Sequence, residues 1–151
     1  MIAYIDTGVL LKAYVLEPDS AAAIKLIESA GTEIAYSHLH ELEMVNALQL
    51  KRFRDEITSR QLAASLGMID TDRADGRLFR TSYRLEKVFS RATDLAIRYS
   101  AKHATRSLDL LHVAIALETR CDHFVSFDRR QRRAALDEKL TVLPRRLPAQ
   151  R

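Results

Sequence analysis

The chain has 151 residues, of which 47% are hydrophobic and 29% are charged, a size and composition that suit one domain with its own core and exclude a disordered chain. The single cysteine, Cys121, excludes an internal disulfide bond and a zinc site built from several cysteines. No apolar run approaches the roughly 18 residues of a membrane span, and the first residues show no export signal, so we expect a soluble cytoplasmic protein.

The N-terminal half of the chain alternates between β-rich segments and helical patterns. Residues 2–5 form an apolar run that predicts a buried strand, and residues 9–16 predict a short helix. A further helix is expected to begin at Ser20 as its N-cap and to end at Gly31. The pattern then predicts a strand over 33–37, a helix over about 39–52, and another helix from Thr58 or Ser59 to about 69.

The C-terminal half continues this alternation. Residues 70–77 are polar and contain Asp-Gly, which predicts a turn, whereas residues 83–102 have the apolar spacing of a long helix. Ser107 is placed to cap a helix over 108–118. The remaining residues predict a strand over 123–127, a helix of about two turns, and a last strand over 140–143.

Short apolar strands separated by helices are typical of an α/β fold, in which helices cover both faces of a mostly parallel sheet. The sequence shows no internal repeat and no linker, so we treat residues 1–151 as a single domain. Residues 144–151 are expected to form an irregular basic tail.

The end of the chain is strongly basic. Residues 129–151 carry eight bases and two acids, an excess larger than the net charge of +4 of the whole chain. Such a region favours nucleic acid or an acidic protein as partner, and a solvated surface is the alternative. The candidates for gripping RNA phosphates are Arg129, Arg130, Arg132 and Arg133.

Four acids lie in apolar or structurally special positions. Asp6 and Asp128 each follow a predicted strand, Asp109 lies in the first turn of its helix, and Glu43 lies in the helix after the second strand. Ligands of open parallel sheets bind beyond the carboxyl ends of the strands, so the four acids can converge on one cleft. Two alternatives stay open: Asp109 and Asp128 are also favourable at helix N-termini, and Glu41 can stand in for Glu43.

Convergence of carboxylates has an electrostatic cost. Two of them about 4 Å apart repel by about 4 kcal/mol near a protein surface, which raises their pKa values unless a cation is present. A hard divalent ion such as Mg²⁺ relieves this repulsion and prefers oxygen ligands. Such ions also stabilise the attacking and leaving oxygens of a phosphodiester.

Four segments in this order resemble the PIN-domain family, and more narrowly the VapC toxins of bacterial and archaeal toxin–antitoxin pairs. The segments are Tyr4-Ile5-Asp6-Thr7 with Gly8 to Lys12, Glu43 to Leu48, Ser107 to Ala114, and Phe124 to Asp128. Their order and separation fit the family over essentially the whole chain. The resemblance implies a three-layer PIN-like fold.

The resemblance also implies an activity and partners. It implies an endoribonuclease that depends on Mg²⁺, or on Mn²⁺ as a substitute, that is inhibited by a cognate VapB-like antitoxin and that forms a homodimer. The acids of the family fall on Asp6, Glu43, Asp109 and Asp128, which decides for Glu43 over Glu41. Thr7 and Ser126 match the small hydroxyl residues near the family's site and are expected to be accessory.

Other residues carry weaker signals. His112 shares a helix face with Asp109, and a buried, hydrogen-bonded core histidine is favoured over a metal ligand. His38 and His40 favour surface or capping roles, and Cys121 favours a small buried residue. Gly8, two residues after Asp6, excludes a phosphatase that needs a second aspartate there.

The sequence therefore predicts a metal-dependent endoribonuclease in which Asp6, Asp109 and Asp128 bind Mg²⁺. Glu43 acts as a further ligand or orients the water that attacks the phosphodiester in line. One alternative is a non-catalytic module that binds RNA or a partner. Another alternative is a structure-specific DNA nuclease of the flap type. Such enzymes need an additional helical arch, for which this chain is too short.

Overall fold

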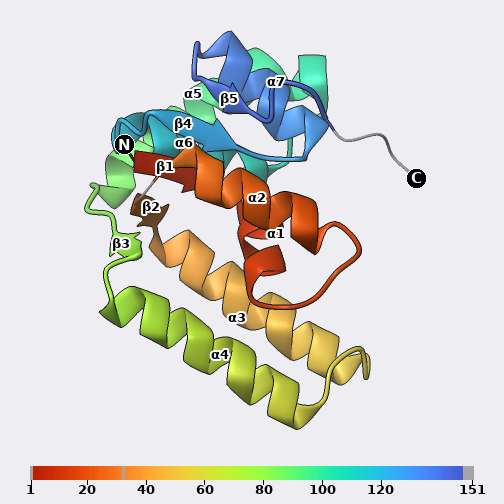
Figure 1. The fold of residues 1–151 in the computed structure, drawn as a ribbon. Helices are drawn as coiled ribbons and strands as arrows, with labels where there is room; N and C mark the ends of the chain where they lie inside the picture. Colours follow the sequence, from red (N-terminus) through yellow and green to blue (C-terminus); the bar gives the residue numbers. More distant parts are fainter. Residues whose placement is uncertain (1, 32, 148–151) are drawn as a thin grey trace.

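The structure of this protein is a computed structural model that describes residues 2–31 and 33–147 (Figure 1). Its centre is one five-stranded sheet with the strand order β3-β2-β1-β4-β5, and all four strand pairings are parallel. The predicted α/β fold is confirmed, and the sheet is parallel throughout. The strands are β1 (Ile2–Ile5), β2 (Glu33–Tyr36), β3 (Leu78–Arg80), β4 (His123–Val125) and β5 (Val142–Leu143).

Helices occupy most of the remaining chain. They are α1 (Thr7–Leu10), the short 3₁₀ helix η1 (Leu11–Ala13), α2 (Ser20–Ala30), α3 (His38–Phe53), α4 (Ser59–Ala74), α5 (Leu85–His103), α6 (Ser107–Glu118) and α7 (Arg129–Asp137). The described residues include no helix that is both long enough and apolar enough to cross a membrane. Residues 148–151, the end of the predicted basic tail, lie outside the described residues.

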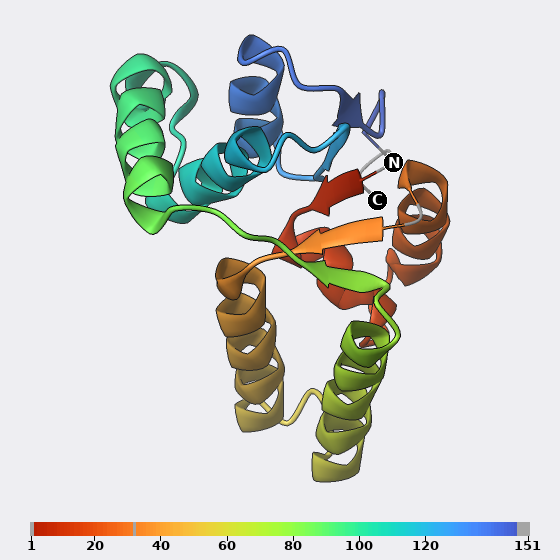
Figure 2. The ribbon, with the colours of Figure 1, turned by 90° about the vertical axis from the view of Figure 1, so that its left-hand side faces the viewer.

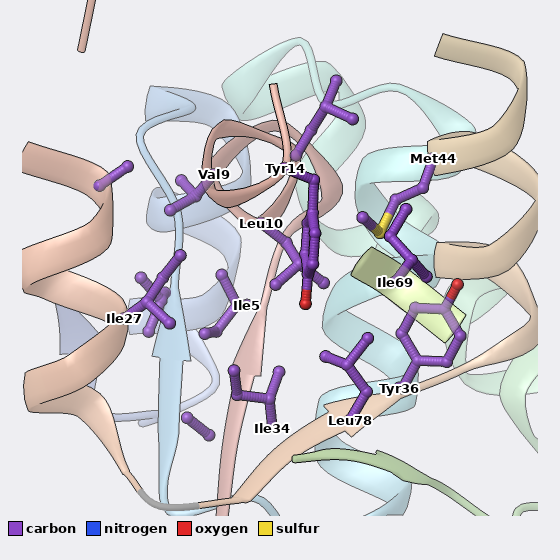
Figure 3. Packing of buried hydrophobic residues seen from close by; sticks show 14 of the residues in the cluster. Ile5, Val9, Leu10, Tyr14, Ile27, Ile34, Tyr36, Met44, Ile69 and Leu78 are labelled. Carbon is purple, nitrogen blue, oxygen red and sulfur yellow. The ribbon is translucent and has the colours of Figure 1, made fainter. Parts of the chain in front are cut away.

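The helices form two layers, one on each face of the sheet (Figure 2). Alternation along the strands explains this, because Ala3 and Ile5 enter one core whereas Tyr4 enters the other. The first core packs against α1 to α4 and is shown in Figure 3. The second core packs against α5, α6 and α7. Strands buried on both faces account for the continuous apolar runs in the sequence.

Three predictions about elements need correction. Helix α4 continues to Ala74 where a turn was expected from residue 70, because its polar last turn lies on an exposed face and Arg73 pairs with Glu41 and Asp70. Strand β3 was missed, since it is three residues long with only Leu78 buried. Both predicted serine caps are wrong by one residue. Ser20 begins α2 after the N-cap Asp19, and its hydroxyl instead accepts from the backbone N of Glu17. Ser107 is likewise the first residue of α6, after the N-cap Arg106.

The neighbouring strands β1 and β4 bring their carboxyl ends together. In the register of β1 with β4, Ile5 lies beside Val125, and the backbone N of Asp6 donates to the carbonyl of Val125 at 2.8 Å. Asp6 and Ser126 are therefore neighbours at one edge of the sheet. Helices α1 and α7 begin next to this edge, at Thr7 and Arg129.

Candidate active site

All four predicted acids line one cavity of about 490 Å³ at this edge of the sheet. They come from the end of β1, from α3, from α6 and from the residue before α7, so the fold joins segments that are far apart in the chain. Glu41 is not among the lining residues, because its carboxylate bonds Arg80 Nη2 at 2.7 Å. Besides the four acids, the lining of the cavity includes Thr7, Arg106, His112 and Gln131.

Asp6 is the most enclosed acid at the strand ends. It is 4% exposed, and its Oδ1 accepts from the backbone N of Val9 at 2.8 Å, which makes it the N-cap of α1. Burial raises the pKa of Asp6, although the bond from Val9 acts in the opposite direction. The ionised form of Asp6 is therefore stabilised less in this structure than it is in water.

Glu43 lies in the second turn of α3 and is held by two side chains. Its Oε2 accepts from Thr7 Oγ1 at 2.8 Å and from His112 Nε2 at 2.6 Å. Burial raises the pKa of Glu43, but these hydrogen bonds outweigh it and hold the pKa below its usual value. Thr7, predicted as accessory, thus contacts a site carboxylate directly.

Asp109 is 4% exposed in the first turn of α6 and is the most extensively bonded of the acids. Its Oδ2 accepts from the backbone N and from the Nε of Arg106, both at 3.1 Å, and its Oδ1 accepts from Gln131 Nε2 at 3.0 Å. Burial raises the pKa of Asp109, but the bonds from Arg106 and Gln131 outweigh it and lower the pKa. The helix-cap interpretation of Asp109 therefore holds alongside its place in the cavity.

Asp128 is the N-cap of α7. Its Oδ1 accepts from the backbone N of Arg130 at 2.7 Å and of Gln131 at 3.1 Å. Ser126, the second predicted accessory residue, is fully buried, and its hydroxyl accepts from the backbone N of Asp128 at 3.0 Å. The cap thus fixes Asp128 at the cavity instead of excluding it from the site.

Arg106 supplies the positive charge nearest to two of the acids. Besides bonding Asp109, its guanidinium lies 3.9 Å from Asp128 Oδ2. The side chain is 68% exposed, so this ion pair is of the weak, exchangeable kind. Sequence reasoning missed Arg106, although its position three residues before Asp109 indicates a contact across one helical turn.

The cavity is lined by carboxylate and amide oxygens, which are the kind of ligand that a hard divalent cation prefers. Oxygens that accept no hydrogen bond from any described residue include Glu43 Oε1, Asp128 Oδ2 and the buried Gln131 Oε1. In residues 2–31 and 33–147, however, no three Asp, Glu, His or Cys side chains are grouped so that they could hold a metal. Arg106 contacts both Asp109 and Asp128, so a cation shared by these two acids would have to displace it.

The basic residues of α7 divide into two kinds. Arg129, Arg130 and Arg133 are exposed. Arg132 is only 7% exposed, and its terminal nitrogens donate to the carbonyls of Ser126, Leu143 and Pro144. The assignment of Arg132 to RNA phosphates is therefore corrected, because its donors already hold the backbone at the ends of β4 and β5.

The histidines and the cysteine follow their predicted roles. His112 is buried with both ring nitrogens bonded, to Tyr4 and to Glu43. His40 is buried and completes the capping box of α3 with Ser37, whereas His38 is exposed. Cys121 is a buried free thiol.

A larger cavity of about 590 Å³ lies between α2 and α4. Its walls are mostly apolar, and Asp72 at its edge already accepts from the Tyr14 hydroxyl at 2.6 Å. It does not gather acids as the smaller cavity does, so we assign the chemistry to the smaller one.

Comparisons with known proteins agree with this fold. The profile of the PIN domain matches residues 3–136. A crystal structure of VapBC2 from Rickettsia felis, bound to a DNA fragment from their promoter, shares 18% identity over 94% of this chain and 97% of that chain, with a TM-score of 0.64. A structure of FitAcB from Neisseria gonorrhoeae shares 15% identity over 94% and 96%, with a TM-score of 0.61. No curated protein sequence matches the chain.

Proposed function

The chain belongs to the PIN domain family, and on that premise we propose that it is a divalent-metal-dependent endoribonuclease that hydrolyses RNA phosphodiester bonds. PIN domains are generally nucleases. The observation that carries the proposal is the convergence of Asp6, Glu43, Asp109 and Asp128, from four separate segments, on one cavity.

In this proposal Asp6, Asp109 and Asp128 hold Mg²⁺, with Mn²⁺ as a possible substitute, and Glu43 is a further ligand or orients water. When bound, the cation neutralises the acids and stabilises the charge that develops on the phosphate. The chain's own residues hold the carboxylates in place before any ligand arrives. The donors are the backbone N–H groups of Val9, Arg106, Arg130 and Gln131 and side chains such as that of Thr7.

The RNA is expected to approach over the beginning of α7. Arg129 and Arg130 follow Asp128 directly, and with Arg133 they form an exposed basic group on α7, whose N-cap Asp128 lines the cavity. Arginine donors bind phosphate oxygens through charge-assisted hydrogen bonds. These three residues would position the backbone of RNA without reading its sequence.

We further propose that the protein is the toxin of a VapBC-type module. The two solved relatives are described as VapBC2, crystallised with promoter DNA, and as FitAcB. The partner would be a VapB-like antitoxin, and the protein itself would be a homodimer. Large apolar side chains on the surface support a protein partner, including Leu42 at 68% exposure and Phe53 at 83%.

Paired substitutions in one helix test the activity. Glu43→Gln is expected to slow RNA cleavage by about 100-fold or more, the scale on which lost electrostatic stabilisation slows enzymes. Glu41→Gln, two residues away and outside the cavity, is the control and should leave the rate within about twofold. Asp6→Asn should act like Glu43→Gln, and EDTA should abolish wild-type cleavage until Mg²⁺ is restored.

The same assay separates the alternatives. Cleavage that survives both EDTA and Asp6→Asn contradicts the metal-dependent mechanism. Binding of RNA without cleavage favours the non-catalytic module, and faster cleavage of a matched branched DNA favours a structure-specific DNA nuclease.

A further inference from the structure

A line of three hydrogen-bonded side chains runs from the core to the cavity. The hydroxyl of Tyr4 in β1 lies 2.8 Å from His112 Nδ1, and His112 Nε2 in α6 lies 2.6 Å from Glu43 Oε2 in α3. Tyr4 is fully buried and His112 is 2% exposed, so bulk water does not compete for these bonds. The line therefore links a site carboxylate to the rigid centre of the sheet.

The chemistry of the three groups sets the direction of each hydrogen bond. An ionised carboxylate only accepts, so His112 Nε2 carries a proton and donates it to Glu43. In the neutral ring Nδ1 is then an acceptor, which the Tyr4 hydroxyl satisfies because a phenol keeps its proton at neutral pH. Tyr4 thus selects the tautomer of His112 that can donate to Glu43.

We propose that His112 is a positioning residue, which holds the carboxylate of Glu43 in one orientation and leaves Oε1 available to the ligand of the cavity. Two donors, His112 Nε2 and Thr7 Oγ1, meet on Oε2, and Oε1 accepts from no described residue. The inference rests on the proposed function and adds to it how Glu43 is kept in place. Neither ring nitrogen of His112 remains for a metal.

A second buried histidine shows what a purely structural role looks like. His40 is fully buried, and its ring centroid lies 5.3 Å from that of His112. Its Nε2 donates to the carbonyl of Ile5 at 2.7 Å, and its Nδ1 accepts from the backbone N of Ser37 at 3.0 Å. Both histidines make hydrogen bonds inside the core, but only His112 bonds an acid of the cavity through one of its ring nitrogens.

This pair gives the experiment a matched control. His112→Leu removes the donor at similar volume, His112→Gln restores an N–H donor on the side chain, and His40→Leu removes the other buried histidine. Tyr4→Phe deletes a single oxygen and keeps the packing, in case His112→Leu folds poorly. Each variant is measured for the fraction folded, for kcat and KM on RNA per folded molecule, and for Mn²⁺ affinity by calorimetry without RNA.

For His112→Leu we expect kcat to fall about 10- to 100-fold and Mn²⁺ to bind more weakly by a similar factor, as is typical when a supporting partner of a ligand is removed. KM should change by less than about threefold, because the RNA contacts lie elsewhere. His112→Gln should recover most of the loss, Tyr4→Phe should show a smaller fall in kcat, and His40→Leu should affect only stability.

Two results would overturn the inference: His112→Leu with wild-type kcat and Mn²⁺ affinity, or His40→Leu with an equal loss of both. A failure of the proposed function looks different. If the wild-type protein neither binds Mn²⁺ nor cleaves RNA, both proposals fall, whereas a wild type that binds Mn²⁺ without cleaving still tests the positioning role through affinity.

Discussion

At the scale of single residues, each acid of the cavity is already engaged by the chain. Val9 holds Asp6, His112 and Thr7 hold Glu43, and Arg106 bonds Asp109. Most of these donors are buried or belong to the backbone, but Arg106 is exposed and charged. Arg106 is therefore the partner that the proposed cation would displace most easily.

Replacement of Arg106 tests this competition. Arg106→Gln is expected to raise the affinity for Mn²⁺ by up to about fivefold, because an exposed ion pair contributes about 0.2–1 kcal/mol and no longer has to be broken. Arg130→Gln, which removes an exposed charge that makes no side-chain bond to Asp109, should bind Mn²⁺ within about twofold of wild type. Unchanged or weaker binding in Arg106→Gln, measured by calorimetry, would contradict the competition.

A second residue makes stability depend on pH. Burial lowers the pKa of His40 to about 3, whereas a histidine in the unfolded chain titrates near 6.5. Between these values the unfolded state binds a proton that the native state does not, so stability falls as pH falls through this window.

We therefore expect His40 to contribute a loss of about 2 kcal/mol in the free energy of unfolding between pH 6.5 and pH 5. Urea unfolding at the two pH values measures it. The variant His40→Gln cannot bind that proton and should lose correspondingly less over the same interval. An equal pH dependence in both proteins would contradict this prediction, because it would show that His40 does not contribute to the change in the free energy of unfolding.

At the scale of elements, the ends of β4 and β5 depend on a side chain of α7. The guanidinium of Arg132 donates to three backbone carbonyls at or just after the ends of these strands, those of Ser126, Leu143 and Pro144. Ser126 in turn accepts from the backbone of Asp128. One helix therefore fixes the strand ends and presents an acid of the site.

Two neighbouring arginines of α7 separate structure from binding. Arg132→Met is expected to lower the free energy of unfolding by about 2–3 kcal/mol, because it leaves buried carbonyls without charge-assisted donors. Arg133→Met, on the exposed face, should stay within about 0.5 kcal/mol in urea titrations but weaken RNA binding with a smaller salt dependence. Equal stability of the two variants would refute the structural role of Arg132.

At the scale of the whole molecule, the surface carries an apolar stripe on α5. Leu85, Phe89 and Ile97 are 62%, 53% and 77% exposed, and they are spaced at multiples of four along the helix. Residues four apart share one face of a helix, so Leu85 and Phe89 lie side by side, and Ile97, eight residues further, continues this exposed row partly around the helix. Such a row suits burial in an interface, and the proposed homodimer offers one.

A charged substitution in this row of α5 tests whether it forms the dimer interface. Phe89→Glu is expected to give a monomer in size-exclusion chromatography with light scattering, because a carboxylate in an apolar interface is left without a partner. Phe53→Glu, on α3 and 83% exposed, is the control and should leave the dimer intact. A monomeric wild-type protein would contradict the homodimer, and a dimeric Phe89→Glu would place the interface elsewhere.

Much of the scaffold follows from local patterns in the sequence. Strand periodicity and capping residues located β1, β2 and β4 and most helices, since these signals lie within a few neighbouring residues. The position of Asp6 and Asp128 after strands of a parallel sheet also predicted that both can line one cleft, while the resemblance to a known family supplied the choice of Glu43.

The side chains that support those acids depend on tertiary packing. Glu43 and His112 are 69 positions apart, and their contact depends on how α3 and α6 pack over the sheet. The same packing turned Arg132 inward while Arg133 stayed outside, although both stand in one run of basic residues. Local patterns cannot encode such partners, because the direction of a side chain becomes fixed only when its helix is seated against the core.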